Sequence, residues 1–340
     1  MKQKTNCTIT DDWTYKGMKV IFLENEYMRI GILADRGSDI FEFKYKPYDL
    51  DFLLRLSKGI KNPAHDFSQM RNTPNQFEDY YYGGWQEILP NSQMFNYRGA
   101  LLGMHGEVSL IPWKYSILKD SEEEVSVKFW TRTLRMPVLI EKILSINKGE
   151  LKLKISEKLT NEGNTHLDIM WGHHIAFGLP FLKNGASIET NAKIMEAESS
   201  IIGPRKFIAG KQFKWPMAEN IDRVMENASK IPSIETHAYR DLCYLKGYDS
   251  KAYYAIKNED NIGFRLEWNG DLFKCLWLWQ ERCATLDFPW WGKCYTVALE
   301  PWTSSYTQNP EEAIAKKEWL HLDSGQIIAT ELSAEIFSAA

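Results

Sequence analysis

Two adjacent histidines, His173 and His174, occupy the otherwise apolar stretch DIMWGHHIAFGLP (168–180). Successive side chains of a β-strand point to opposite faces, so the two imidazoles cannot share a face if the stretch is extended. His173 shares its face with large apolar residues such as Trp171 and Ile175, whereas the same-face neighbours of His174 are mostly glycine and alanine. We expect His173 in the core and His174 beneath a space for a ligand, with simple packing of His174 under a loop as the alternative.

A glutamate has a similar setting in KCYTVALEPW (293–302), where Glu300 shares its face with the small residues Thr296 and Ala298. A single glutamate near the end of a strand is usually solvated. On the far side of a bound molecule from an imidazole, however, a carboxylate can remove one proton while the imidazole delivers another. We therefore take His174 and Glu300 as the candidate acid–base couple.

Two further stretches carry candidate binding residues. His105 lies in LLGMHGEVSLIPW (101–113), for which alternation predicts a strand, and the flanking Gly103 and Gly106 would permit close approach of a ligand.

Upstream, YYYGGWQEILPN (80–91) combines paired glycines with Trp85, Gln86 and Glu87. Paired glycines favour a turn, and indole, amide and carboxylate groups bind polar ligands. This stretch is interpreted as a binding loop, with a tight turn closed by an aromatic plug as the alternative.

The elements that must position these residues are mostly short strands. Apolar and polar residues alternate with a period of two, as in LKLKISEKLT (151–160), and turn signals separate the runs, which favours a large antiparallel all-β sandwich. The best helix signal is NPEEAIAKKEW (309–319), and residues 57–82 and 203–235 are predicted as long loops. We expect a single domain over residues 1–340. The other predicted strands are 28–33, 39–45, 125–134, 138–147, 252–257, 262–268, 272–279, 294–300 and 327–337.

Composition and motifs exclude several classes of protein. The net charge is −4 and no long basic run is present, so nucleic acid is not an expected partner. No segment approaches the ~18 apolar residues of a membrane helix, and no signal peptide is recognisable, so we expect a cytoplasmic protein. G-x-S-x-G, Walker and H-E-x-x-H motifs are absent, as is C-x-x-C among the five cysteines. Adjacent strand histidines face apart, so no metal site is expected.

Three stretches follow one another in an order that resembles the aldose 1-epimerase, or galactose mutarotase-like, superfamily. They are MHG (104–106), H-x-x-F (174–177) and L-E-P (299–301). RGSDIFEFKY (36–45) and WLHLDSGQIIATELSAEIF (319–337) are similar to the first and last strands of that superfamily. The resemblance covers most of the chain and looks closest to a divergent branch.

The resemblance implies a β-supersandwich with an open sugar cleft and a mechanism that needs no cofactor. Glu300 would take the proton of the anomeric hydroxyl while His174 protonates the ring oxygen, so that the ring opens and closes to either anomer. His105 would bind or orient the ring-oxygen side, and Gln280 of LWLWQE would face the cleft beside Trp279 or Trp277.

The chain also departs from the galactose mutarotases, which carry an arginine shortly before the first histidine. The nearest arginines here are Arg71 and Arg98, and Arg71 is kept as a candidate sugar contact. The sugar-binding aspartate has no clear match, with Asp241 and Asp249 as candidates. These departures leave the identity of the sugar open.

The expected partner is therefore a small-molecule sugar, and both a monomer and a homodimer remain open. Two alternatives to an epimerase use the same scaffold. One is a carbohydrate-binding or sensing protein without turnover. The other is a related sugar isomerase or lyase that moves a proton on carbon. An acid–base pair favours an enzyme, because binding alone does not need one.

Overall fold

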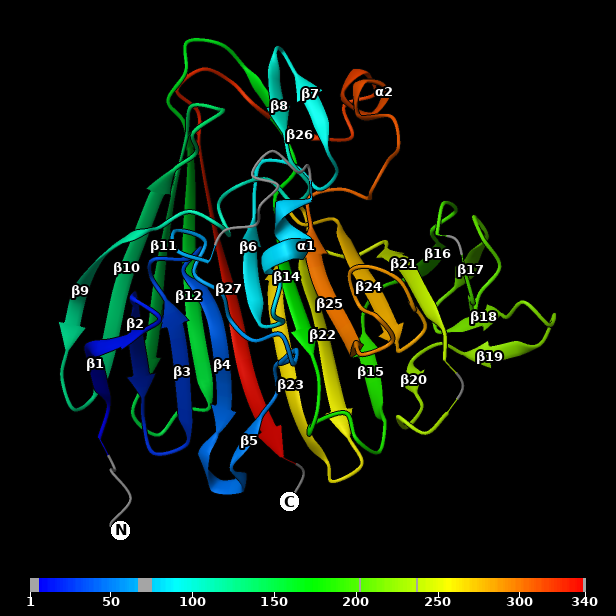
Figure 1. Cartoon of the computed structure of the whole chain (residues 1–340), viewed down its shortest axis with the longest axis horizontal. Helices are drawn as coiled ribbons and strands as arrows, with labels where there is room; N and C mark the ends of the chain where they lie inside the picture. The colour runs from blue at the N-terminus through cyan, green and yellow to red at the C-terminus, as the bar shows by residue number, and fades with distance from the viewer. Residues whose placement is uncertain (1–5, 67–74, 202, 237, 339–340) are drawn as a thin grey trace.

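The computed structural model describes residues 6–66, 75–201, 203–236 and 238–338. Within these ranges the chain forms a 12-stranded and a 9-stranded sheet, both antiparallel, with three two-stranded ribbons (Figure 1). No helix in the described ranges is long and apolar enough to span a bilayer.

The 12-stranded sheet has the order β1-β2-β3-β4-β6-β14-β25-β24-β21-β16-β17, and β5 pairs with β4. Its strands are β1 (Thr8–Tyr15), β2 (Met18–Glu24), β3 (Met28–Leu33), β4 (Asp39–Tyr45), β5 (Leu50–Asp51), β6 (Trp85–Ile88), β14 (Gly172–Phe177), β16 (Ile194–Ala197), β17 (Gln212–Lys214), β21 (Arg240–Lys246), β24 (Cys275–Arg282) and β25 (Tyr295–Trp302).

The 9-stranded sheet has the order β20-β15-β22-β23-β27-β12-β11-β10-β9. Its strands are β9 (Lys114–Asp120), β10 (Glu124–Arg132), β11 (Val138–Asn147), β12 (Lys152–Asn161), β15 (Ala186–Thr190), β20 (Lys230–Ile231), β22 (Lys251–Asn258), β23 (Ile262–Asn269) and β27 (Ile327–Ser338).

The remaining elements are short. The ribbons pair β7 (Phe95–Tyr97) with β8 (Ala100–Leu102), β13 (Leu167–Ile169) with β26 (Leu320–Leu322), and β18 (Met217–Glu219) with β19 (Met225–Asn227). The helices are α1 (Gln76–Tyr80), α2 (Pro310–Ala315) and the 3-10 turn η1 (Lys46–Tyr48).

The core lies between the two sheets. Along β11, buried and half-buried side chains alternate over all 10 residues, as the sequence pattern predicts. Phe43 of β4 and Phe177 of β14 both pack against Phe264 of β23, with ring centroids 5.1 and 5.2 Å apart. Each such ring contributes about 2 kcal/mol or more on burial, so these contacts join the two sheets.

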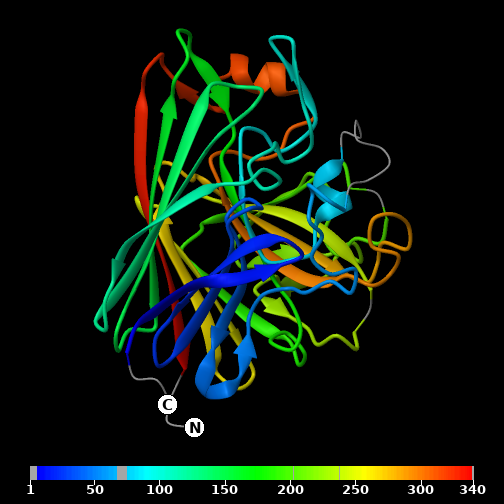
Figure 2. The ribbon, with the colours of Figure 1, turned by 60° about the vertical axis from the view of Figure 1, so that its left-hand side comes forward.

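Three central strands, β6, β14 and β25, are buried on both faces. Their inner face packs on the 9-stranded sheet, and their outer face is covered by α1 and by loops (Figure 1). Figure 2 shows β27 along one side of the molecule and α1 on the opposite side, with the first sheet between them. The covered outer face is where a site can form.

The all-β sandwich predicted from the sequence is confirmed, and most expected strands match within two residues. The exceptions have physical causes. The strand predicted over 272–279 begins at Cys275, because residues 270–274 form the turn that connects β23 to β24. The predicted helix 309–319 is present only as α2, where the side chain of Asn309 caps the N–H of Glu312.

Two predicted stretches take a different form. Residues 101–113 are mostly turns, since β8 ends at Leu102, and residues 80–91 contain the central strand β6 rather than a binding loop. The predicted loop 203–235 carries the four short strands β17 to β20, and 57–82 includes α1.

Candidate active site

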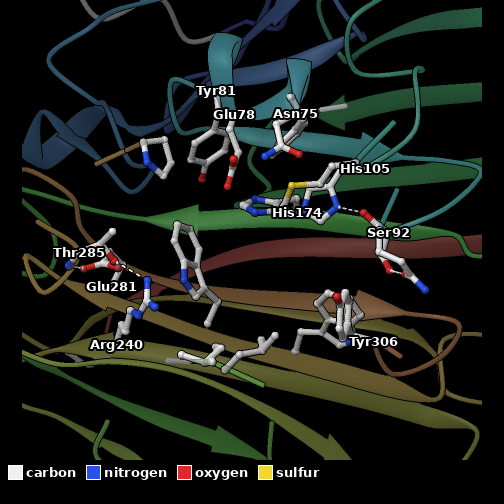
Figure 3. Close-up of a pocket in the computed structure, with 18 of the residues that line it drawn as sticks. Asn75, Glu78, Tyr81, Ser92, His105, His174, Arg240, Glu281, Thr285 and Tyr306 are labelled. Carbon is white, nitrogen blue, oxygen red and sulfur yellow. Dashed lines mark hydrogen bonds between the residues drawn. The ribbon is translucent and has the colours of Figure 1, made fainter. Parts of the chain in front are cut away.

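A cavity of about 580 Å³ lies over the outer face of the 12-stranded sheet, where β14, β25 and β24 are neighbours. These strands supply part of its lining, including His174, Glu300 and Trp279. Tyr81, which follows α1, supplies one wall (Figure 3), and Trp290, from the loop between β24 and β25, also lines the cavity. A cavity of this size can enclose a small ligand.

The register of β14 and β25 brings His174 and Glu300 together. Gly172 pairs with Trp302, so the residues two positions inward, His174 and Glu300, stand opposite each other. His174 Nε2 lies 3.6 Å from Glu300 Oε1. Glycine is required at 172, because a Cβ there would lie 2.2 Å from the Trp302 ring.

Glu300 is buried, and burial raises the pKa of its carboxyl group to about 8. The indole N–H of Trp302 donates to Glu300 Oε2 over 3.0 Å, which partly offsets that rise by favouring the ionised form. In the free protein at neutral pH, Glu300 therefore holds a proton.

His174 is buried beside aromatic rings, 5.0 Å from Tyr81 and 5.8 Å from Trp279 between centroids. Burial, together with the nearby His105, lowers the pKa of His174 well below its usual value. The free couple thus carries one proton, on Glu300, and a neutral imidazole that can accept it. Groups whose surroundings move their pKa values apart mark acid–base assignments.

His105 reaches the cavity from a turn rather than from a strand. Its φ is +59° and that of Gly106 is +64°, and a Cβ at 106 would lie 2.1 Å from the Leu89 carbonyl oxygen. His105 Nδ1 donates to the Ser92 carbonyl oxygen over 2.9 Å, which leaves Nε2 as an acceptor. The ring centroid is 5.6 Å from that of His174, and burial lowers the pKa of His105 to about 4.

The structure therefore brings four of the predicted site residues to one cavity, His174, Glu300, His105 and Trp279. Asp241 and Asp249 do not line it: Asp241 accepts from the Lys206 and Phe207 amides, and Asp249 pairs with Lys193. Arg71 lies outside the described residues.

Four other predicted residues are buried elsewhere. Trp85 packs in the core between the sheets, and Glu87 on the same face of β6 contacts Lys142 and Trp171. Gln86 donates to Asp39 and to the Gly83 carbonyl oxygen, and Gln280 accepts from the Tyr239 hydroxyl. The structure does not place these four side chains in the lining of the cavity.

His173 faces the interior, as strand parity predicts, but it joins a polar cluster there. Its Nε2 is 3.2 Å from Glu157 Oε2, and its Nδ1 accepts the indole N–H of Trp85 over 3.2 Å. Burial, and then the charge of Glu87, raises the pKa of Glu157 to about 7.

Among the described residues, Glu87, Glu157 and His173 are the group whose ligand atoms lie close enough for a metal ion. The indole N–H can only donate, so Nδ1 of His173 offers it the lone pair and the ring proton sits on Nε2, toward Glu157. Lys142 Nζ lies 3.4 Å from Glu87 and already supplies a positive charge. These residues fit a buried hydrogen-bonded cluster better than a cation site.

The family model of a domain of unknown function, DUF4432, matches residues 15–336. The chain belongs to the DUF4432 family. No curated protein matches it in sequence.

Solved structures with a similar fold include proteins described as an aldose 1-epimerase or as galactose mutarotase-like. A protein of Klebsiella pneumoniae subsp. pneumoniae, provisionally described as an aldose 1-epimerase, has a TM-score of 0.71 at 14% identity and covers 95% of this chain and 80% of its own. A galactose mutarotase-like protein from Clostridium acetobutylicum has a TM-score of 0.67 at 15% identity, covering 98% and 99%. Another galactose mutarotase-like protein, from Lactobacillus casei, has a TM-score of 0.61 at 18% identity. The match covers 94% of this chain and 100% of that protein.

These identities are low, so the likeness concerns the fold. The DUF4432 protein has the galactose mutarotase-like fold, as its sequence resemblance implies.

Sequence reasoning missed the lining residues Tyr81 and Trp290, and it missed Trp302, which donates to Glu300. Trp302 shares the face of Glu300 by strand parity, so that signal was present in LEPW. Tyr81 and Trp290 arrive from segments outside the strands, and nothing local in the sequence places them over β14.

Proposed function

We propose that this protein is an aldose 1-epimerase-like isomerase, which interconverts the α and β anomers of a hexose or modified sugar by acid–base ring opening. The observation that carries the proposal is the His174–Glu300 couple, which lines the cavity with its nitrogen and oxygen 3.6 Å apart. The fold shared with proteins described as aldose epimerases and mutarotases supports it.

The chemistry needs one base, one acid and no redox partner. Glu300 as carboxylate accepts the proton of the anomeric hydroxyl, the C1–O5 bond breaks as O1 becomes the aldehyde oxygen, and O5 takes a proton from His174. Rotation about C1–C2 presents the other face of the aldehyde. Closure by the reverse transfers returns both protons and yields the other anomer.

The free couple holds the required single proton, but on Glu300 rather than on His174. Moving that proton across the 3.6 Å gap creates the carboxylate and the imidazolium without any exchange with solvent. Sugar hydroxyls that donate to Glu300 on binding would favour this ionised arrangement, because hydrogen bonds to a carboxylate lower its pKa. His105 Nε2 is an acceptor that can orient a hydroxyl of the bound ring.

The test is exchange NMR or polarimetry on a panel of free aldoses. The wild-type protein should accelerate anomer exchange for at least one sugar, and Glu300→Gln should lose that acceleration while Glu318→Gln, an exposed glutamate, keeps it. Sugar binding that survives Glu300→Gln with no acceleration in the wild type would instead identify a binding protein. Deuterium uptake from solvent at carbon would identify an isomerase or lyase.

A further inference from the structure

The cavity is larger than one sugar ring requires. A hexose occupies roughly 200 Å³, about the share of seven liquid waters, whereas the cavity measures about 580 Å³. His174 and Glu300 both line it. Ser92 and Tyr306 lie to one side of His174, and Arg240, Glu281 and Thr285 lie to the other (Figure 3). A ring bound at the couple therefore leaves part of the cavity unfilled.

A succession of rings leads from the couple to the edge of the cavity. The centroid of Trp279 lies 5.8 Å from that of His174, and the centroid of Trp290 lies 5.7 Å from Trp279. The ring centroid of Tyr81 lies 5.7 Å from that of Trp290, and the two ring planes meet edge-on at 70°. Phe288, on the same loop as Trp290, is 50% exposed. Trp279 and Trp290 are half-buried and line the cavity, and aromatic ring surface of this kind stacks on the C–H faces of sugars.

Polar groups border the far end of this aromatic succession. Arg240 Nη1 donates to Thr285 Oγ1 over 3.0 Å, and Glu281 accepts from the amides of Ala284 and Thr285. A side chain network of hydroxyl, guanidinium and carboxylate suits ligand hydroxyls, which both donate and accept. The Thr285 hydroxyl also donates to Glu281 Oε2 over 2.6 Å, so a ligand hydroxyl would add a bond to the remaining lone pairs of this network, which an apolar aglycone could not do.

The charges of the cavity favour an uncharged ligand. Besides the protonated Glu300, its described lining holds the carboxyl groups of Glu78, Glu198 and Glu281 against the guanidinium of Arg240. An added phosphate would face this acidic majority at close range, where like charges repel.

We infer that the natural substrate is the reducing end of an uncharged disaccharide or longer saccharide. This inference rests on the proposed function, because the ring at Glu300 and His174 must keep a free anomeric hydroxyl. The next sugar is therefore attached through another hydroxyl of the reacting ring, and it lies on Trp290 and Trp279, toward Arg240 and Thr285.

The experiment compares glucose and galactose with maltose, cellobiose, lactose and melibiose, each for binding by calorimetry and for anomer exchange by NMR. At least one disaccharide should bind more tightly than its own reducing-end hexose. Trp290→Ala should lower that preference by roughly tenfold, the order expected for one lost aromatic contact. Trp291→Ala is the matched control, since Trp291 is 63% exposed on the same loop and does not line this cavity.

Two readouts separate this inference from the proposed function. A disaccharide preference that Trp290→Ala removes supports the second sugar position even if no sugar shows accelerated exchange, which would overturn the epimerase alone. Accelerated exchange with equal preference for hexose and disaccharide, or equal effects of the two tryptophan variants, would overturn the inference and leave the epimerase standing. Tighter binding of glucose 6-phosphate than of every disaccharide would also overturn it.

Discussion

His173 and His174 each face a glutamate, on opposite sides of β14. The inner pair has Nε2 and Oε2 3.2 Å apart, and the outer pair has Nε2 and Oε1 3.6 Å apart. The inner pair is enclosed in the core, where the Trp85 indole donates to His173 and the neighbouring Glu87 contacts Lys142 and Trp171. The outer pair has one indole partner, Trp302, and a cavity.

The comparison shows that proximity of an imidazole and a carboxyl group does not by itself make an active site. A pair enclosed in the core has no room for a ligand and contributes to stability, because removing one member leaves its buried polar neighbours without a contact. A pair that opens on a cavity keeps capacity for a ligand. The inner face of β14 therefore contributes to stability and the outer face to the candidate active site. The following variants test this assignment.

The largest expected effect comes from exchanging either histidine for asparagine. His174→Asn removes the proton acceptor of the couple and should lower the rate of anomer exchange by about 10²–10⁴-fold, with little change in the free energy of unfolding. His173→Asn should do the reverse, costing about 3 kcal/mol of stability because the Trp85 and Glu157 groups lose their partner. Denaturant unfolding and rate measurement on the folded fraction check both.

Equal losses of rate in the two histidine variants, at equal stability, would contradict the assignment of His174 to catalysis and His173 to stability. The neighbouring positions make each variant the control for the other, since both lie on β14 and both are buried.

Lys142→Met tests the inner cluster alone. Lys142 Nζ lies 3.4 Å from Glu87 Oε2, and both side chains are buried. Removing one member of a buried ion pair usually costs about 3–5 kcal/mol, because the other charge stays buried without its partner. The double variant Lys142→Met with Glu87→Gln should recover part of that loss. A single variant as stable as the wild type in urea would show that Glu87 is not held as an anion.

Much of the fold and part of the site follow from the sequence. Parity on β14 and β25 assigns His174 and Glu300 to one face, because both strands are regular and their neighbours are small. The same assignment by strand parity fails at His105 and Trp85. His105 lies in a turn at positive φ. The four-residue strand β6 follows paired glycines, so its sequence is typical of a loop, to which strand parity does not apply. Tyr81 and Trp290 depend on how covering segments pack, which local patterns do not encode.

The dependence of kcat/KM on pH distinguishes the outer pair from an ordinary buried carboxyl group. The active couple carries one proton, so activity should fall tenfold per pH unit above about 8, where Glu300 loses it. On the acidic side it should fall only below the lowered pKa of His174. A rate that instead climbs through pH 8 would mean that the shared proton is not required.

The raised pKa of Glu300 also makes the free energy of unfolding depend on pH. A group whose pKa is higher in the folded state stabilises the fold below its unfolded pKa, and that contribution disappears as pH rises through the folded value. As pH rises from about 5 to 8, the free energy of unfolding should therefore fall less in Glu300→Gln than in the wild type. Thermal unfolding at a series of pH values measures the difference.

The smallest expected effect comes from Trp302→Phe, which removes the single indole partner of Glu300. Without that donor the ionised carboxylate is less favoured, so the alkaline fall in kcat/KM should move upward by about one pH unit or less, with a several-fold lower rate. The change also costs roughly 1 kcal/mol through the stack with Trp277, whose centroid is 4.4 Å away. Trp277→Phe disturbs the same stack but keeps the donor, so its alkaline limb should stay in place. If both variants moved the limb equally, packing rather than the hydrogen bond would set the pKa of Glu300.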